Sequence, residues 1–277
     1  MWVLGCNNLG LFTNFHQAER LIKCAIEFGI DSFDTSPSYG KRHDSERYLG
    51  QILSKTHYNT TVCTKMIDLP SSGIDIPSTI KQSILSSAHR LQRQKIDKLL
   101  LPKPFIFQHL VSLLETISEC IDRQLVGGYG FSDVTASELS AVCHYCTMQG
   151  LIQPSVIQNE VNLLTRPISY EMIQLSQCYQ IKIWGYAPLA GGILTGKYLG
   201  LRTARSQGRY DSYPDTHRLN QLISHHTKLQ QLDEIAAKND CLMSDIALEW
   251  AQSHSAADCI IIGARTEQQL VQCLSRM

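Results

Sequence analysis

The sequence of 277 residues predicts a single-domain α/β protein, a (β/α)8 TIM barrel that spans residues 1–277. Eight short runs of apolar or β-branched residues recur along the chain, and a segment with helical spacing follows each run. Strands that alternate with helices pair in parallel through right-handed crossovers. Eight such units in about 250 residues match the usual size of a barrel.

The expected strands are the apolar runs themselves, which are short and rich in β-branched residues or leucine. They lie at residues 3–5, 30–34, 60–64, 98–101, 126–131, 155–158, 181–186 and 259–262. The expected helices lie near residues 16–29, 44–54, 76–93, 108–122, 135–148, 168–179, 217–253 and 266–276. Ser78 and Asp133 stand where helix caps are expected.

One long irregular segment, residues 199–217, follows the seventh expected strand and is rich in Gly, Arg, Ser and Tyr. We expect a flexible loop there, placed as a flap over a site. A doubly wound sheet is the competing architecture, and it usually carries a Gly-rich turn after its first strand. Residues 4–8 do not form that G-x-G-x-x-G turn, so the sequence favours the barrel.

The composition excludes several classes of partner. Lysine plus arginine equals aspartate plus glutamate at 25 each, so no bulk charge attracts nucleic acid or an anionic membrane. No apolar run reaches the roughly 20 residues that span a bilayer. The first residues lack the pattern of a secretory signal, which predicts a cytoplasmic protein with reduced thiols. The pair Cys143 and Cys146 lies in an expected helix without a second C-x-x-C, so we expect no metal site.

Chemistry is indicated first by the segment FDTSPSYG and the Thr-Lys that ends the next expected strand. These residues place Asp34, Tyr39 and Lys65 near the ends of two successive strands. A free tyrosine has a pKa of about 10 and is a poor acid at neutral pH. A nearby ammonium stabilises the phenolate and lowers that pKa, and a carboxylate holds the lysine in place. The trio predicts proton transfer.

In a barrel, functional groups gather at the carboxyl ends of the strands. Seven of the eight expected ends carry a polar or aromatic side chain, and the fourth, which ends at Pro102, does not. The residues at the seven ends are Asn7, Asp34, Lys65, Ser132 with Asp133, Gln158 with Asn159, Tyr186, and Gly263 to Arg265.

The segment 191–198 resembles a P-loop but has Tyr198 where such a loop needs Ser or Thr, so we reject a nucleotide-hydrolysing function. The loops after strands seven and eight of a barrel commonly bind phosphate. Gly191 and Gly192 allow close backbone approach, and the turn at Gly263 leads with Arg265 into the last helix. Together with an aromatic ring and amide-binding side chains at other strand ends, these features describe a site for NADPH.

Motifs along almost the whole chain are similar to those of the aldo-keto reductase family. The matching pieces are GIDSFDTSPSYG with SERYLG, VCTK, RLQRQKIDKLLL, GFSD, IQNEVNLL, YAPLAGGILTGKY and IIGARTEQQL. The resemblance implies a (β/α)8 barrel that reduces a small-molecule carbonyl, an aldehyde or a ketone, with hydride from NADPH. NADH is the less favoured cofactor.

The resemblance also implies a role for each matching residue. Tyr39 would donate the proton, Lys65 would lower its pKa, and Asp34 would pair with Lys65. The residues implied for the cofactor are Ser132, Asp133 and Gln158 at the carboxamide, Tyr186 against the nicotinamide, Ala187, Pro188, Leu189, Gly191 and Gly192 around the diphosphate, and Gly263, Arg265 and Gln269 at the adenosine phosphate. The residues implied for the substrate are Asn7, Pro102, Lys103 and Phe105.

Three positions depart from the family pattern. Asp133 replaces a more usual asparagine, and Cys273 replaces an asparagine that contacts adenine. Pro102 stands at the position of a histidine that helps to polarise the carbonyl, and proline offers no donor. The loss of one such donor typically costs 10²–10³-fold in rate.

Two other functions stay open, and Pro102 motivates the first of them. The barrel would use its tyrosine and lysine for proton transfer without redox, as a lyase or isomerase, or would bind cofactor as a catalytically silent scaffold. A reductase consumes NADPH with product, and the other two do not. The sequence carries no feature that predicts an oligomeric state.

Overall fold

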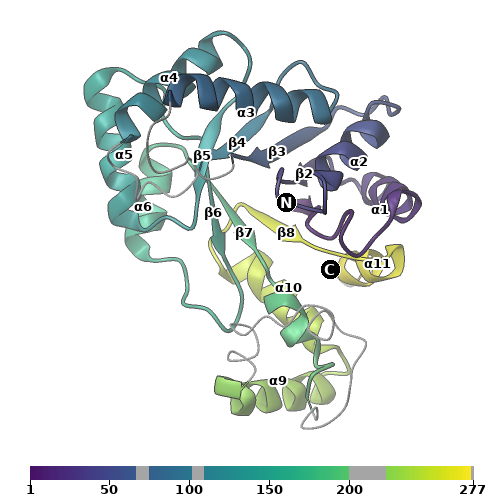
Figure 1. The fold of residues 1–277 in the computed structure, drawn as a ribbon. Coiled ribbons are helices and arrows are strands. Elements are labelled where there is room, and N and C mark those ends of the chain that lie inside the picture. Colours follow the sequence, from purple (N-terminus) through teal and green to yellow (C-terminus); the bar gives the residue numbers. More distant parts are fainter. Residues whose placement is uncertain (67–74, 102–108, 200–222, 276–277) are drawn as a thin grey trace.

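The computed structural model describes residues 1–66, 75–101, 109–199 and 223–275. Within them the chain forms a closed barrel of eight parallel strands in the order β1 to β8 (Figure 1). The strands are β1 (Trp2–Gly5), β2 (Ser32–Asp34), β3 (Thr61–Lys65), β4 (Lys98–Leu101), β5 (Tyr129–Ser132), β6 (Val156–Glu160), β7 (Lys182–Tyr186) and β8 (Cys259–Ile262). The fold is therefore the predicted single-domain (β/α)8 barrel.

Helices alternate with the strands and lie outside the barrel (Figure 1). They are α1 (Phe15–Glu27), α2 (Asp44–Leu53), α3 (Ile76–Arg90), α4 (Leu110–Asp122), α5 (Ala136–Gln149), α6 (Tyr170–Cys178), the 3-10 helix η1 (Ala190–Thr195), α9 (His226–Lys238), α10 (Met243–His254) and α11 (Glu267–Leu274). Among the described residues, no helix is both long and apolar enough to cross a membrane.

The helical segment expected near residues 217–253 is helical where the structure describes it, but it is interrupted. Among the described residues of this range, from 223 onward, the chain forms α9 and α10. Asp240 lies between them with a φ of 50°, a left-handed conformation that ends a right-handed helix. The hydrophobic period continues across this turn, so periodicity alone does not show the break.

Both expected helix caps were wrong. Asp75 is the N-cap of α3, and the Ser78 hydroxyl donates to its Oδ2 at 2.5 Å. Thr135 is the N-cap of α5, where it forms a capping box with Glu138. Asp133 lies two residues before this cap and has a φ of 57°. It therefore belongs to the carboxyl end of β5 and not to the helix cap.

Two layers of buried side chains hold the barrel together. The larger layer lies between the strands and the helices, and it includes Leu4, Phe33 and Phe131. The smaller layer is a separate cluster of side chains from seven positions on the strands. Its members are Val3, Cys63, Leu100, Val156, Trp184, Cys259 and Ile261. Because side chains alternate along a strand, residues two positions further on face the same way as this interior cluster.

That alternation explains why the polar side chains at the strand ends lie together. Lys65 follows Cys63 by two positions, Gln158 follows Val156, and Tyr186 follows Trp184. Asp34 is the register partner of Cys63, and Ser132 is the partner of Gln158. The polar side chains at the strand ends therefore form the uppermost layer of the barrel interior, above an apolar floor.

Close contact between β5 and β6 requires glycine at position 130. A Cβ atom there would lie 1.7 Å from the Val156 carbonyl oxygen. We predict that Gly130→Ala lowers the free energy of unfolding by about 2 kcal/mol or more, because an added methyl must displace backbone in a packed sheet. Urea denaturation followed by circular dichroism measures the change.

Gly263→Ala is the matched control, because its added Cβ would meet its nearest neighbours, on Asn7 and Asn8, at 3.6 and 3.7 Å. Equal unfolding midpoints for both variants would contradict the packing argument.

Candidate functional site

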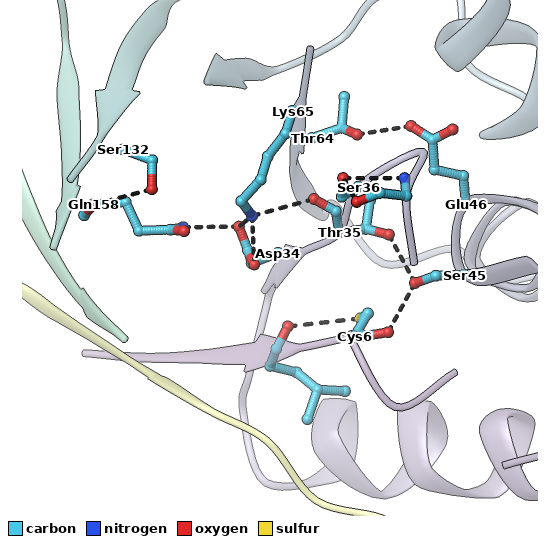
Figure 2. A network of polar contacts seen from close by, with 12 residues as sticks. Cys6, Asp34, Thr35, Ser36, Ser45, Glu46, Thr64, Lys65, Ser132 and Gln158 are labelled. Atoms are coloured by element: carbon cyan, nitrogen blue, oxygen red, sulfur yellow. Dashed lines mark hydrogen bonds and ion pairs between the residues drawn. The ribbon is translucent and has the colours of Figure 1, made fainter. Parts of the chain in front are cut away.

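A buried ion pair between β2 and β3 lies at the centre of the site (Figure 2). Lys65 Nζ donates to both oxygens of Asp34, at 2.7 and 2.9 Å, and to the Thr35 carbonyl at 3.3 Å. These three acceptors match the three N–H donors of an ammonium. Asp34 is 4% exposed, so the carboxylate depends on these contacts for the solvation that it has lost.

Gln158 completes the contacts of the carboxylate from the far side of the barrel. Its Nε2 donates to Asp34 Oδ1 at 2.8 Å, and the residue is 3% exposed. The bond joins β2 to β6 across the top of the barrel interior (Figure 2). The side chain that the family resemblance assigns to a carboxamide thus also fixes the ion pair.

Tyr39 lies beside this pair. Lys65 Nζ is 5.2 Å from the centroid of the Tyr39 ring. The loop that carries the ring is held by its own backbone: the Tyr39 amide donates to the Ser36 carbonyl, and Gly40 adopts a φ of 80°. His43 Nδ1 lies 2.5 Å from the Pro37 carbonyl oxygen, so this imidazole supports the loop from outside. The sequence placed Asp34, Tyr39 and Lys65 together, and the structure brings them together.

The sequence predicted that Lys65 lowers the pKa of Tyr39. That effect is present, but the net pKa is not lowered. Burial raises the pKa of the phenol, and the Lys65 ammonium offsets part of that rise, with a net pKa above the ordinary tyrosine value. Burial alone would lower the pKa of Lys65, but Asp34 and Tyr39 outweigh burial and the net pKa is raised. At neutral pH the site therefore holds a protonated phenol beside a charged ammonium. A phenol in this state has a proton that it can donate.

A second buried pair supports the strand that carries Lys65. Glu46 on α2 is fully buried and accepts from Thr64 Oγ1 at 2.7 Å and from Arg90 Nε at 2.5 Å. The Thr64 bond is drawn in Figure 2. Glu46 thereby ties the helix after the Tyr39 loop to β3 and α3. Sequence reasoning missed Arg90, although a glutamate beside the Tyr motif needs a partner when it is buried.

Three predicted cofactor residues contact one another at the ends of β5 and β7. The Tyr186 hydroxyl donates to Asp133 Oδ1 at 2.8 Å, and the Ser132 hydroxyl donates to Asp133 Oδ2 at 3.2 Å. Ser132 Oγ also lies 3.4 Å from the Gln158 carbonyl oxygen. Sequence reasoning grouped these residues but did not foresee the bond that fixes the Tyr186 ring.

The loop after β7 turns sharply through residues that the resemblance assigns to a diphosphate. Ala187 has a φ of 54°, and Gly191 and Gly192 have φ values of 66° and 100°. The Ala187 carbonyl accepts from Asn162 Nδ2 at 3.1 Å, which anchors the loop to the chain after β6. A Cβ on Gly192 would lie 2.9 Å from Lys197 Nζ, so glycine leaves the backbone accessible beside a cation. Pro188 and Leu189 lie between these turns.

The residues predicted for an adenosine phosphate lie at the start of α11. The Arg265 guanidinium stacks 3.9 Å from the centroid of the Phe12 ring, and the Arg265 amide donates to Gln269 Oε1 at 2.9 Å. The Gln269 side chain therefore stabilises the start of α11, and contact with a ligand would be an additional role. Gly263 faces the Asn7 and Asn8 side chains, and Asn8 Nδ2 donates to the Ala264 carbonyl at 3.0 Å. These contacts join the loop after β8 to the loop after β1.

The remaining site residues fall outside the part of the chain that the structure describes. They are Pro102, Lys103 and Phe105, and the expected loop 199–217 lies outside it after Leu199. Among the described residues, no group of three or more His, Cys, Asp or Glu could hold a metal ion. Cys143 and Cys146 are buried, and burial raises the pKa of Cys143 to about 12, which is the opposite of a reactive thiol.

The chemistry of these groups fits a nicotinamide dinucleotide. Hydroxyl and amide side chains lie at one end, an aromatic ring stands beside them, and two left-handed glycines next to a lysine offer backbone for a diphosphate. Arg265 adds a cation at the start of α11.

Comparisons with known proteins point the same way. The model of the Aldo/keto reductase family matches residues 2–277. Rat aflatoxin B1 aldehyde reductase member 2 is 26% identical over 99% of this chain and 78% of the rat protein. Human aldo-keto reductase family 7 member A3 is 26% identical over 99% of this chain and 87% of its own length. A solved glycerol dehydrogenase from Gluconobacter oxydans has a TM-score of 0.77 at 18% identity, covers 99% of this chain and 85% of that chain, and shares the fold.

The Glu46 contacts generate a stability prediction. Glu46→Gln keeps an oxygen for Thr64 but leaves the Arg90 guanidinium without its anion. We expect the free energy of unfolding to fall by about 3 kcal/mol, the lower end for a broken buried pair, because Arg90 is partly exposed. Urea denaturation measures it.

Glu19→Gln is the control, since Glu19 pairs with Lys23 on the surface and its removal should leave the unfolding midpoint unchanged. Equal midpoints for Glu46→Gln and the wild type would show that the buried pair does not hold β3.

Proposed function

The chain belongs to the aldo/keto reductase family, and from that premise we propose that it reduces an aldehyde or ketone of a small molecule with NADPH. The observation that carries the proposal is the buried Asp34–Lys65 pair with the Tyr39 ring beside it. Burial of this pair costs free energy, because two charges lose their hydration. Proton transfer by Tyr39 gives a reason for a buried ammonium beside the phenol.

Tyr39 is the proposed proton donor. The raised pKa keeps the phenol protonated at neutral pH, so its proton is available for the carbonyl oxygen. As the proton leaves, the Lys65 ammonium stabilises the phenolate that forms, and Asp34 keeps that ammonium charged and in place. NADPH, when bound, supplies the hydride for the carbonyl carbon.

The proposed cofactor residues divide among the loops at the strand ends. Ser132, Asp133 and Gln158 would contact the carboxamide, and Tyr186 would lie against the ring. The backbone from Ala187 to Gly192 would hold the diphosphate. The preference for NADPH over NADH rests on Arg265, whose fixed cation would pair with a phosphate that NADH lacks.

For the substrate, the names of the rat and human relatives suggest which compounds to test first. An aldehyde reductase among them makes aldehydes the first compounds to test. Pro102 supplies no side-chain donor for the carbonyl, so we assign its polarisation to Tyr39 and expect modest rates with simple aldehydes.

We place the reaction in the cytoplasm. All ten cysteines are free, as thiols are in a reducing compartment. The formal net charge of zero gives no reason to propose nucleic acid as a partner.

Tyr39→Phe tests the proton donor. A lost general acid typically costs 10²–10⁴-fold, so we expect kcat for NADPH-dependent aldehyde reduction to fall by about 10³-fold while the Kd for NADPH stays within about twofold. NADPH absorbance with a panel of aromatic and aliphatic aldehydes measures the rate.

Tyr48→Phe is the matched control, because the Tyr48 ring packs edge-on against Phe15 on the outer helices. Wild-type turnover by Tyr39→Phe would refute the assignment. Product formed without NADPH consumption would instead indicate a lyase or isomerase, and binding without any product a scaffold.

The pH dependence follows from the direction of the Tyr39 shift. A pKa above the ordinary value keeps the phenol protonated as pH rises, so kcat/KM for reduction should show no alkaline loss between about pH 6 and 9. Activity should decline only as pH approaches the raised value. A decline centred near pH 7 would mean that Tyr39 is not the acid.

A further inference from the structure

Asp133 is held at the strand ends as an acceptor for two hydroxyl groups. Tyr186 donates to one carboxylate oxygen at 2.8 Å and Ser132 lies 3.2 Å from the other. Aspartate side chains carry a negative charge at neutral pH. Asp133 also lies just before α5, a helix of 14 residues whose amino end favours a nearby negative charge.

No ion pair among the described residues involves Asp133. The ion pairs include Asp34 with Lys65 and Glu46 with Arg90. The Asp34–Lys65 pair is neutral as a unit. Asp133 differs from that pair, because its printed contacts are with the hydroxyl groups of Ser132 and Tyr186, which carry no positive charge.

The position of this charge is fixed by Tyr186. The ring of Tyr186 is the surface against which the nicotinamide would lie, and its hydroxyl is bonded to Asp133. A carboxylate bonded to the hydroxyl of that ring would lie near a ligand whose charge changes during the reaction. The oxidised nicotinamide is a cation, and the reduced nicotinamide is neutral.

We propose that Asp133 makes this site prefer the oxidised cofactor. The inference rests on the proposed function, because it needs the dinucleotide to bind over Tyr186. Coulomb attraction in a partly buried site stabilises the cationic ring but not the neutral one. Asp133 thus lowers the reduction potential of bound cofactor and makes it a stronger hydride donor.

The experiment is a titration of the purified protein with NADP⁺ and with NADPH, read by quenching of tryptophan fluorescence. It measures binding only and needs no substrate. For Asp133→Asn we expect the ratio of the Kd for NADP⁺ to the Kd for NADPH to rise about tenfold. A tenfold change corresponds to about 30 mV in a two-electron potential.

Asparagine isolates the charge from the position. It tolerates the left-handed backbone that Asp133 adopts, and its side-chain oxygen still accepts from Tyr186. Glu138→Gln is the matched control: it removes the same charge near the start of α5, where the carboxylate accepts from Thr135 instead. Its ratio of Kd values should equal that of the wild type.

The outcomes separate the two proposals. A tenfold rise for Asp133→Asn alone supports the inference. An unchanged ratio, or an equal change for Glu138→Gln, overturns it while the reductase assignment stands. If the wild-type protein binds neither NADP⁺ nor NADPH, the proposed function itself fails.

Discussion

The structure of the site depends on one constraint, the need to keep a buried carboxylate and a buried ammonium fully hydrogen-bonded. An unpaired charge at the position of Asp34 would cost several kcal/mol. The pair avoids that cost only while β2, β3 and β6 stay in register, because Asp34, Lys65 and Gln158 come from those three strands. Glu46 and Arg90 repeat the arrangement one layer outward and hold β3 against α2 and α3. The ion pair and the closure of the barrel therefore support each other.

Much of this was predictable because strands and barrels have simple periods. The eight apolar runs marked the eight strands, and the polar residue at the end of a run marked the layer above the apolar interior. Lys65, Gln158 and Tyr186 each follow an interior residue by two positions. The order of the motifs then placed Tyr39 beside Lys65, which the 5.2 Å separation agrees with.

The rest depended on contacts that no local pattern encodes. The turn at Asp240 interrupts a continuous hydrophobic period. Several polar residues lie near the start of α3 and of α5, and the backbone conformation determines that Asp75 and Thr135 are the caps. The pKa of Tyr39 rises because burial outweighs a neighbouring cation, and the balance between the two is set by depth in the fold. The bond from Tyr186 to Asp133 joins residues 53 positions apart. A sequence shows which groups are present, but these outcomes depend on what else surrounds them.

The central claim is that this preassembled group of charges serves a site for NADPH. The most direct measurement is a titration of the wild-type protein with NADPH and with NADH, followed by fluorescence of tryptophan, since Trp184 lies two residues below Tyr186 in the barrel interior. Micromolar binding of NADPH with much weaker binding of NADH is the result that we predict. Failure of both dinucleotides to bind would contradict the account and leave the Asp34–Lys65 pair to serve chemistry without this cofactor.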